Sequence, residues 1–243
     1  MKCVIPCAGF GVRFQSVVPN TPKALVKIGG ERILDRILSN LENVKEVDEV
    51  FVVSNAFFYA DFVKWFDAYK GSKKVRLICD GALRNDDRKG SVFAVKLVLQ
   101  FLNRSGVSDD LLVVYGDNVF SFDLNGLVKK FYSHDKSMQV VFDVKSLSEA
   151  KSLGVYRVKG DDALELLEKP EHPPSTLCAA GVYAFKQSDL RVFFEDYDLP
   201  ELGVGHVFMR LVERGRVKVF PVMDSNWVDI GTKESYERAL REF

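Results

Sequence analysis

The sequence lacks long apolar runs, paired cysteines and an excess of charge of either sign. No hydrophobic stretch approaches the roughly 20 residues that a membrane-spanning helix requires. Residues 1–6 lead into a glycine-rich loop too early for a secretory signal peptide. The 34 Lys and Arg residues balance 34 Asp and Glu residues. We therefore expect no membrane partner, and no nucleic-acid partner of the kind that a basic surface attracts.

Cysteine and histidine are too few and too scattered for a metal site built on sulfur and nitrogen. The four cysteines form no CxxC pair, and none of the three histidines stands beside them at metal-ligand spacing. We expect the cysteines to be reduced and mostly buried, which favours a cytoplasmic location. Any chemistry on phosphates must then depend on where individual charges are placed.

The alternation of apolar runs with amphipathic stretches predicts an α/β fold for the first half of the chain. The apolar run 111–115 suits a parallel strand that is covered on both faces. Strands that alternate with helices in this way predict a Rossmann-like, mainly parallel sheet flanked by helices. The expected strands are 3–5, 49–54, 75–79 and 111–115, and the expected helices are 31–42, 59–69, 91–102 (N-cap Ser91) and 123–134 (N-cap Asp123).

The second half is mixed, because its strands follow one another with few helices between them. We find no repeat, low-complexity tract or linker, and therefore expect a single domain over residues 1–243, with halves of about 1–135 and 136–243. The expected strands are 139–144, 154–159, 163–168, 179–185 and 217–222, and the expected helices are 199–214 and 233–241.

The loop after the first strand combines two glycines with two cations. Gly9 and Gly11 can adopt backbone angles that are closed to other residues, and their missing side chains let backbone N–H groups approach a phosphate. Arg13 adds forked donors, and Lys23 follows in the stiff dipeptide Pro22-Lys23. The loop is neither a dinucleotide-binding fingerprint nor a Walker A loop, because a third glycine and a Gly-Lys-Ser/Thr ending are absent. The combination predicts phosphate binding.

Two aspartates stand at positions that suit a divalent cation. Asp117 follows the strand 111–115, and ligands gather at the carboxyl ends of strands in open α/β sheets. Asp229 follows a short apolar stretch and precedes a glycine turn and a helix. Mg²⁺ takes one or two carboxylates together with substrate phosphates. Each aspartate could equally cap a turn, so the residues alone leave both interpretations open.

The segment IPCAGFGVRF…TPKALVKIGG resembles the signature of the sugar nucleotidyltransferases. This family includes glucose-1-phosphate uridylyl- and thymidylyltransferases and mannose-1-phosphate guanylyltransferases. Its pattern is A-A-G-x-G-T/S-R, followed further along by P-K and then by G-x-P. The chain matches it at Gly9, Gly11, Arg13, Pro22, Lys23 and Leu25, and departs from it at Cys7, Val12 and Arg32.

The resemblance implies that the chain transfers a nucleotidyl group from an NTP to a sugar 1-phosphate, giving an NDP-sugar and pyrophosphate. Arg13 is then expected to hold the leaving β- and γ-phosphates, and Lys23 to bridge the α-phosphate and the incoming phosphate. Asp117, in a G-D-N motif, and Asp229, in a W-x-D-x-G-T motif, are implied to hold the Mg²⁺ cofactor. The implied nucleotide-binding residues, all in the first half, are Ala8, Gly9, Gly11, Arg13, Gly90 and Asp117.

The resemblance also implies that the second half binds the sugar phosphate. Glu168, in an E-K-P motif, is expected to accept hydrogen bonds from sugar hydroxyls, and Lys169 to meet the sugar phosphate. Gly154, in a G-V-Y strand, and Gly181, in an A-G-V-Y strand where the glycine gives the sugar room, complete this set.

The remaining polar motifs indicate less about function. The stretch 80–91 lies where the family reads the base, but its composition does not reveal which base. We expect His134 and His206 to be surface or packing residues of helices, since neither stands in a nucleophile motif.

Three other functions remain open. A related transferase would use a polyol or choline phosphate as acceptor. A glycosyltransferase of similar fold would need an Asp-x-Asp motif after 111–115, where the chain has Asp117-Asn118-Val119. A catalytically silent regulatory protein that binds nucleotide sugars would not need both cations and both carboxylates. Some family members carry an additional β-helix domain, which we do not expect here, and the sequence leaves homo-oligomerisation open.

Overall fold

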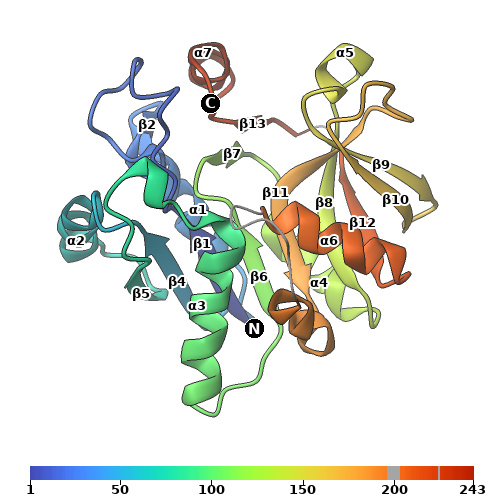
Figure 1. The fold of residues 1–243 in the computed structure, drawn as a ribbon, viewed down its shortest axis with the longest axis horizontal. Coiled ribbons are helices and arrows are strands. Elements are labelled where there is room, and N and C mark those ends of the chain that lie inside the picture. The colour runs from blue at the N-terminus through green and yellow to red at the C-terminus, as the bar shows by residue number, and fades with distance from the viewer. Residues whose placement is uncertain (196–202, 224) are drawn as a thin grey trace.

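A central mixed sheet runs through the molecule (Figure 1). The computed structural model describes residues 1–195, 203–223 and 225–243. Within these residues the sheet has nine strands. In spatial order they are β5 (Lys74–Cys79), β4 (Glu49–Ser54), β1 (Lys2–Pro6), β6 (Leu111–Val114), β11 (Leu177–Phe185), β8 (Ser137–Asp143), β12 (Val217–Val222), β10 (Asp162–Glu168) and β9 (Gly154–Lys159).

The strands of the first half are parallel, as the sequence predicted. β1 pairs in parallel with both β4 and β6, and β4 pairs in parallel with β5. Beyond β6 the pairing changes, because β11 is antiparallel to both of its main neighbours, β6 and β8, and β10 is antiparallel to β9 and β12. Only β8 and β12 restore a parallel pair. The mainly parallel character is therefore confined to the first half, and the sheet as a whole is mixed.

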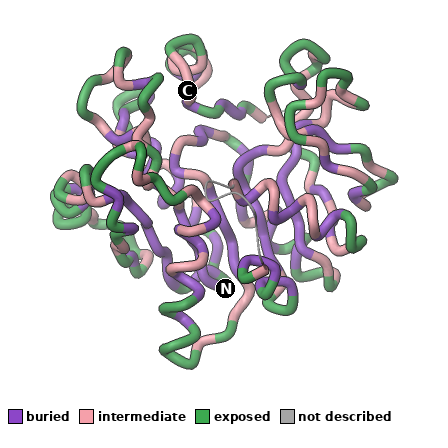
Figure 2. The backbone as a smooth tube through the Cα atoms, viewed as in Figure 1, coloured by how far each residue is buried: buried purple, intermediate pink, exposed green. Residues whose placement is uncertain are grey.

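Helices cover both faces of the sheet and divide the core into two large apolar layers. Along β1, Cys3 and Ile5 pack in one layer with α1 (Ile33–Glu42) and α4 (Leu124–Tyr132). Val4, between them, packs in the other layer with α3 (Gly90–Arg104), α6 (Val204–Glu213) and η3 (Gln187–Phe194). This follows from the alternation of side chains along a strand. Figure 2 shows the result, with buried strands inside and exposed helix surfaces outside.

Several short elements were not expected from the sequence. β7 (Asn118–Phe120) pairs with β13 (Trp227–Asp229), and β2 (Lys27–Ile28) pairs with β3 (Glu31–Arg32). The second pair corrects the helix that was predicted to begin at residue 31, because residues 31–32 hydrogen-bond to 27–28 and α1 starts two residues later. The others are η1 (Lys23–Leu25), η2 (Asn85–Asp87) and α5 (Leu147–Ala150).

The remaining helices lie close to their predicted positions. α2 spans Tyr59–Ala68 and α7 spans Lys233–Glu242, while α6 begins at Val204, and residues 199–202 of the expected helix lie outside the described residues. Asp123 caps α4 as predicted, since its side chain accepts from the Asn125 N–H. The expected cap at Ser91 is wrong. α3 begins one residue earlier, at a glycine with φ of 79°, and Ser91 lies in its first turn.

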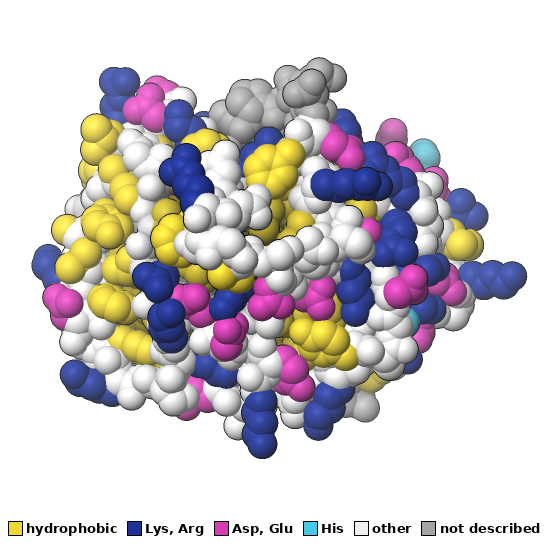
Figure 3. Space-filling model, turned by 90° about the horizontal axis from the view of Figure 1, so that it is seen from below, with side chains coloured by type: hydrophobic (Ala, Val, Ile, Leu, Met, Phe, Trp, Pro, Cys, Tyr) yellow, Lys and Arg dark blue, Asp and Glu magenta, His cyan; other side chains and the backbone are white. Residues whose placement is uncertain are grey.

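The face of the molecule seen from below carries mixed charge (Figure 3). Lys and Arg side chains are interspersed with Asp and Glu, while hydrophobic side chains gather on the side of α2 and β5. The edge strand β5 places Lys74 and Arg76 outward, where both pair with Glu49 of β4. Charges on an edge strand discourage pairing with another chain. None of the helices described is long and apolar enough to cross a bilayer.

Candidate active site

The loop after β1 is held in shape by its own residues. Gly11 has a φ of 59°, and its carbonyl accepts from the backbone N–H groups of Phe14 at 2.7 Å and Gln15 at 3.0 Å. The Phe14 ring is fully buried against Tyr236 of α7, with ring centroids 5.5 Å apart. The Gln15 amide donates to the carbonyls of residues 10 and 21. These contacts leave Arg13 exposed, free to meet a ligand.

The glycines of this loop differ in what they do. Gly11 was predicted to need an unusual backbone angle, and its positive φ confirms this. Gly9 is not among the residues with positive φ, and nothing lies within 4 Å of the place where a Cβ would stand. Ala8 offers its carbonyl to the side chain of Asn55, which is fully buried at the end of β4. Gly9 therefore leaves open space beside a loop that is anchored on both sides.

Lys23 and Asp117 meet as an ion pair. Lys23 opens η1 directly after Pro22, and its Nζ lies 3.1 Å from Oδ2 of Asp117. The stem of Lys23 runs along Gly11, where an added Cβ would stand 3.3 Å from its carbons. Gly116 is packed as closely, since a Cβ there would lie 3.2 Å from the Pro6 carbonyl oxygen. The two predicted motifs of the first half therefore converge at the carboxyl ends of β1 and β6.

The pairing of β7 with β13 brings the second aspartate to the first. Asn118, directly after Asp117, stands opposite Asp229 in this ladder. The Ile230 N–H also donates to the Asp117 carbonyl oxygen at 2.9 Å. Two motifs far apart in the chain are thus fastened together by backbone hydrogen bonds.

The charges around Asp229 show how the site is balanced. Although its side chain reaches solvent, protein surrounds it in the cleft, and this burial together with the Asp117 carboxylate raises the pKa of Asp229. Lys23, Arg13 and Lys169 oppose that shift, so all three predicted cations stand within electrostatic reach of it. Within the described part of the chain, no hydrogen bond or ion pair satisfies the Asp229 carboxylate.

This arrangement fits a hard divalent cation. Two carboxylates lie together, one of them without a partner of its own. Residues 1–195, 203–223 and 225–243 contain no cluster of three or more His, Cys, Asp or Glu side chains that would form a complete protein cage. Mg²⁺ needs no such cage, because it keeps waters and binds substrate phosphates beside one or two carboxylates. Asp117 and Asp229 are the residues that would hold it.

A cleft of about 440 Å³ opens beside these aspartates. It is framed by the second half of the sheet and the start of α6. Of the predicted site residues, it brings together Arg13, Gly154, Glu168, Lys169, Gly181 and Asp229. The predicted residues that do not line it are Ala8, Gly9, Gly11, Lys23, Gly90 and Asp117. The sugar-side set thus forms one wall, with Arg13 reaching it from the first loop.

Glu168 and Lys169 lie at the end of β10, where the chain turns sharply. Gly154 stands opposite Glu168 in the β9–β10 ladder, and a Cβ at Gly154 would lie 3.4 Å from Glu168 Oε2. Lys169 has a φ of 48°, which is unusual for a residue with a side chain. Its backbone N–H donates to the Leu153 carbonyl, and its Nζ lies 3.4 Å from Glu168 Oε1. The turn presents both charges to the cleft.

Gly181 is required by packing inside the protein. A Cβ there would stand 2.8 Å from Asn118 Oδ1 and 2.9 Å from the Tyr115 Cβ. The β11–β8 register shifts between Ala179 and Tyr183, so the backbone at Gly181 bulges towards β7. The close approach of Asn118 is therefore one reason for a glycine here. Gly181 also lines the cleft, and the expectation that it makes room for a sugar stays a prediction.

Tyr115 and Ser91 join the two halves beneath the cleft. The Tyr115 hydroxyl lies 2.8 Å from Ser91 Oγ and accepts from the Val204 N–H at 2.9 Å. Ser91 Oγ also accepts from the Val204 N–H, at 3.2 Å. Burial raises the pKa of Tyr115 to about 12, so the hydroxyl stays protonated at neutral pH. The start of α3, next to Gly90, is thereby tied to the start of α6.

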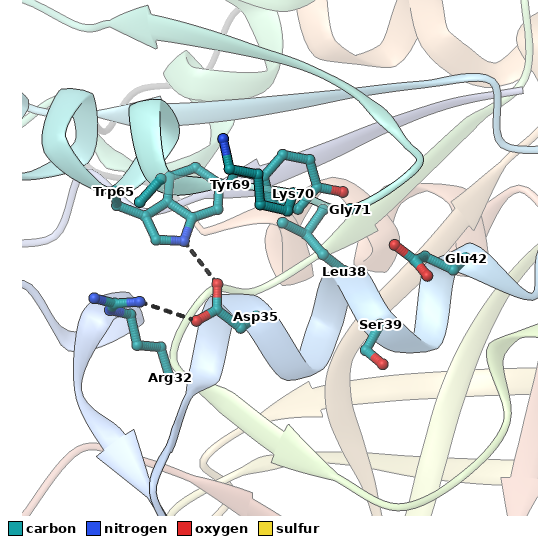
Figure 4. A pocket seen from close by; sticks show the side chains of 10 residues that line it. Arg32, Asp35, Leu38, Ser39, Glu42, Trp65, Tyr69, Lys70 and Gly71 are labelled. Atoms are coloured by element: carbon teal, nitrogen blue, oxygen red, sulfur yellow. Dashed lines mark hydrogen bonds and ion pairs between the residues drawn. The ribbon is translucent and has the colours of Figure 1, made fainter.

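A second cavity, of about 280 Å³, lies between α1 and α2 (Figure 4). Its most central carboxylate, Asp35, accepts from the indole N–H of Trp65 at 2.7 Å and from Arg32 at 3.3 Å. The side chains of Arg32, Asp35 and Trp65 thus pair with each other. None of the predicted site residues lines this cavity, so the cleft remains the candidate active site.

A family model described as nucleotidyl transferase matches residues 2–243. The chain belongs to this nucleotidyl transferase family. The resemblance seen in the first loop and in the two aspartate motifs is thereby confirmed.

Individual relatives are distant. The chain is 28% identical to the bifunctional protein GlmU of Methanocaldococcus jannaschii, over 95% of this chain and 51% of that protein. It is 27% identical to a glucose-1-phosphate adenylyltransferase of Desulfitobacterium hafniense, over 96% and 62%. It is 24% identical to the UTP–glucose-1-phosphate uridylyltransferase AglF of Haloferax volcanii, over 98% and 95%. The chain thus spans about half the length of the GlmU protein.

The fold has a counterpart among solved structures. A Bacillus anthracis structure assigned as a glucose-1-phosphate thymidylyltransferase, in complex with a sucrose, superposes with a TM-score of 0.82. The match covers 99% of this chain and 94% of that one, at 21% identity. It supports the fold of this nucleotidyl transferase, a mixed sheet between helical layers.

Sequence reasoning missed several residues that line the cleft of this nucleotidyl transferase, among them Tyr115, Asn118, Trp227 and His206. Asn118 and Trp227 stand inside the quoted motifs and Tyr115 stands directly before one, so proximity to Asp117 and Asp229 was a signal that could have found them. His206 was expected to be a surface or packing residue of a helix. It does lie on a helix and is half-buried, but its place in the cleft was not predicted. It lies near the start of α6, whose N-terminal end faces the cleft, and no sequence pattern announces that orientation.

Proposed function

We propose that this chain transfers a nucleotidyl group from an NTP to a sugar 1-phosphate, with Mg²⁺, giving an NDP-sugar and pyrophosphate. The observation that carries the proposal is the convergence of Arg13, Lys23 and Lys169 around the paired carboxylates Asp117 and Asp229. A phosphoryl group that is attacked by another phosphate concentrates negative charge, and such a ring of cations stabilises it. The related adenylyl- and uridylyltransferases carry names of the same reaction class.

The reaction needs positioning and charge neutralisation rather than proton transfer. An oxygen of the sugar phosphate, already anionic at neutral pH, attacks the α-phosphorus in line. A new P–O bond forms as the bond from the α-phosphorus to the bridging oxygen breaks, and pyrophosphate leaves with that electron pair. Arg13, exposed on the loop, holds the leaving phosphates. Mg²⁺, when bound by Asp117 and Asp229, supplies further neutralisation at the α-phosphate.

Lys23 changes partner as substrates arrive. Without ligands its ammonium group pairs with Asp117, which keeps both charges compensated in a partly buried place. The Lys23 ammonium group moves from Asp117 to the α-phosphate and the incoming phosphate when these bind. The ion pair with Asp117 therefore keeps Lys23 within reach of the place where the phosphates bind.

The acceptor side of the cleft has the features of a sugar-phosphate site. Glu168 presents carboxylate oxygens that accept from hydroxyl groups, and Lys169 presents an exposed ammonium group next to it. Both project from one turn, so a single acceptor carrying hydroxyls and a phosphate can satisfy them together.

Pyrophosphate release tests the proposal. The purified chain is incubated with Mg²⁺ and each of five nucleotides, ATP, GTP, CTP, UTP and dTTP, against a panel of sugar 1-phosphates and against choline phosphate and a polyol phosphate. We expect release with a sugar 1-phosphate, and the productive pair names the base and the acceptor. Release only with a non-sugar phosphate would overturn the acceptor class. Nucleotide binding without release from any pair would favour the regulatory alternative.

A further inference from the structure

Asn118 occupies the junction of all the segments that build the metal site. Its side chain is buried, with 1% of the residue exposed. Its Oδ1 accepts from the Trp227 indole N–H at 2.7 Å and from the Gly181 backbone N–H at 3.1 Å. Its Nδ2 donates to Oδ1 of Asp117 at 3.2 Å. One amide thus contacts β11, β13 and the carboxylate that is proposed to hold the metal.

The orientation of this amide follows from its partners. Two N–H donors face one end, so that end must be the oxygen. A carboxylate faces the other end, so that end must be the NH₂ group. The reversed amide would place a donor against two donors and an oxygen against an anion, which a buried site does not tolerate. The asymmetric surroundings therefore fix the side chain in one orientation.

The same contacts fix where Asp117 points. Its Oδ1 accepts from Asn118, and its Oδ2 lies 3.1 Å from Lys23 Nζ. Asp229 stands opposite Asn118 in the β7–β13 ladder, so a second carboxylate lies close to Asp117 and repels it. When Lys23 leaves for the phosphates, Asn118 is the described side chain that still holds Asp117 by a hydrogen bond.

We infer that Asn118 is a positioning residue that orients Asp117 for the divalent cation and sets its place relative to Asp229. The inference rests on the proposed function, in that it takes Asp117 and Asp229 as metal ligands. Trp227, which anchors the Asn118 oxygen, stands two residues before Asp229 on β13. Asn118 therefore contacts both segments that carry the carboxylates. The close packing at Gly181, where a Cβ would stand 2.8 Å from Asn118 Oδ1, keeps the amide in place from the third side.

Asn118→Asp separates this role from a merely structural one. The substitution keeps the shape and keeps an oxygen acceptor for Trp227 and Gly181, so the contacts that hold β7, β11 and β13 together survive. It removes the N–H that Asp117 accepts and places a like charge beside it. A structural role predicts little change, whereas a positioning role predicts weaker metal binding.

The measurement is Mn²⁺ binding by the full chain, followed by water-proton relaxation, together with thermal unfolding without metal. We expect the Mn²⁺ dissociation constant of Asn118→Asp to rise about 10- to 100-fold, as is usual when a partner of a metal ligand is removed. We expect kcat for pyrophosphate release to fall by a similar factor, with the KM for the sugar phosphate little changed. Wild-type Mn²⁺ affinity in a folded Asn118→Asp protein would overturn the inference.

Trp227→Phe provides a second test should Asn118→Asp fail to fold. It removes one of the two donors to Asn118 Oδ1 and leaves the contact to Asp117. We expect a larger loss of thermal stability and a smaller, few-fold loss of Mn²⁺ affinity than in Asn118→Asp. An unchanged Mn²⁺ affinity in Trp227→Phe would contradict the inference.

The two proposals can fail separately. Should the wild-type chain bind Mn²⁺ but release no pyrophosphate from any pair, the proposed reaction fails, while the affinities of the variants still decide the role of Asn118. Should the reaction proceed and Asn118→Asp bind Mn²⁺ like the wild type, only the positioning role is lost.

Discussion

On the first-half side of the site, the segment from the end of β1 to the first residue of η1 carries both Arg13 and Lys23. The residues of the second-half side come from separate elements. Gly154 lies on β9, Glu168 ends β10, Gly181 lies on β11 and His206 lies on α6. The loop is anchored within itself by Phe14 and Gln15, through burial and local hydrogen bonds.

The difference follows from how each sheet region is connected. Parallel strands all end at one edge, so the loops after β1 and β6 meet there without further help. Antiparallel strands alternate in direction, so a wall built from β9, β10 and β11 must draw on ends and middles of strands. A short continuous motif suffices to fold the first side, while the second depends on strand register. Six substitutions test this contrast, from the largest expected effect to the smallest.

Asp117→Asn and Asp229→Asn remove one carboxylate charge from each side of the β7–β13 pair. Because the proposed metal contributes several kcal/mol at the reacting phosphate, we expect pyrophosphate release to fall on the order of 10³-fold or more in either variant. Steady-state assays over a range of Mg²⁺ concentrations measure this.

The stability of the same two variants should differ. Asp229→Asn relieves an unpartnered carboxylate beside Asp117, so its thermal midpoint without metal should equal or exceed that of the wild type. Asp117→Asn breaks the ion pair with Lys23 and should lower it. Retained turnover in both variants would contradict the metal assignment.

Lys23→Ala and Lys169→Ala are a matched pair of cation deletions, one on each side. Lys23 is proposed to act on charge that develops in the transition state, so we expect kcat to fall about 10²- to 10³-fold. Lys169 is proposed to bind the acceptor phosphate, so its loss should raise the KM for that substrate about tenfold or more and leave the KM for the nucleotide unchanged. Initial rates with each substrate varied in turn distinguish the two patterns. Identical patterns in the two variants would contradict the different roles proposed for Lys23 and Lys169.

Tyr115→Phe tests the connection between the halves. It removes the hydroxyl that contacts Ser91 and accepts from the Val204 N–H, although Ser91 Oγ can still accept from that N–H. We expect a loss of about 1 kcal/mol in the free energy of unfolding, as for one buried hydrogen bond. Urea unfolding measures it, with Tyr59→Phe on α2 as the control. No loss relative to the control would show that α3 and α6 are held together by packing alone.

Asp143→Asn, at the end of β8, tests a local charge contact far from the first loop. Hydrogen bonds from Lys145 and Thr176 lower the pKa of Asp143 to about 2. A depressed pKa means that the contribution to stability is full above the unfolded value of about 4 and is lost as the pH falls through about 2. Because solvent screens the contact, we expect the variant to lose less than about 1 kcal/mol at pH 7. Urea unfolding at pH 7 and pH 2 measures it, and an equal loss at both would exclude the charged contact.

Most of the first half could be predicted from the sequence. The strand 49–54 was predicted with the bounds that the structure has, because its run of valine and phenylalanine fits a buried strand in few other ways. The bend at Gly11 was predictable from composition, since only glycine adopts such angles without strain. Asp123 was recognisable as a helix cap, because its side chain accepts from a backbone N–H only two residues further on.

The sequence alone could not give the contacts between distant segments. β7 and β13 have three residues each, too short to show an alternating pattern, and only their pairing places Asp229 beside Asp117. The place of His206 in the cleft was not predicted, because the direction in which α6 points is set by packing and by the hydrogen bond from the Val204 N–H to the Tyr115 hydroxyl.

The sequence by itself therefore determined the layered α/β fold and the family, and it located the first loop and the two aspartates as candidate site residues. Only the tertiary structure decided that Lys23 pairs with Asp117 and that Asn118 packs closely against Gly181. It also decided that the Asn118 amide contacts three segments of the chain. Local propensities act over a few neighbouring residues and leave a readable pattern. A hydrogen bond between residues 118 and 227 leaves none, because it forms only after the whole sheet has set the distance between them.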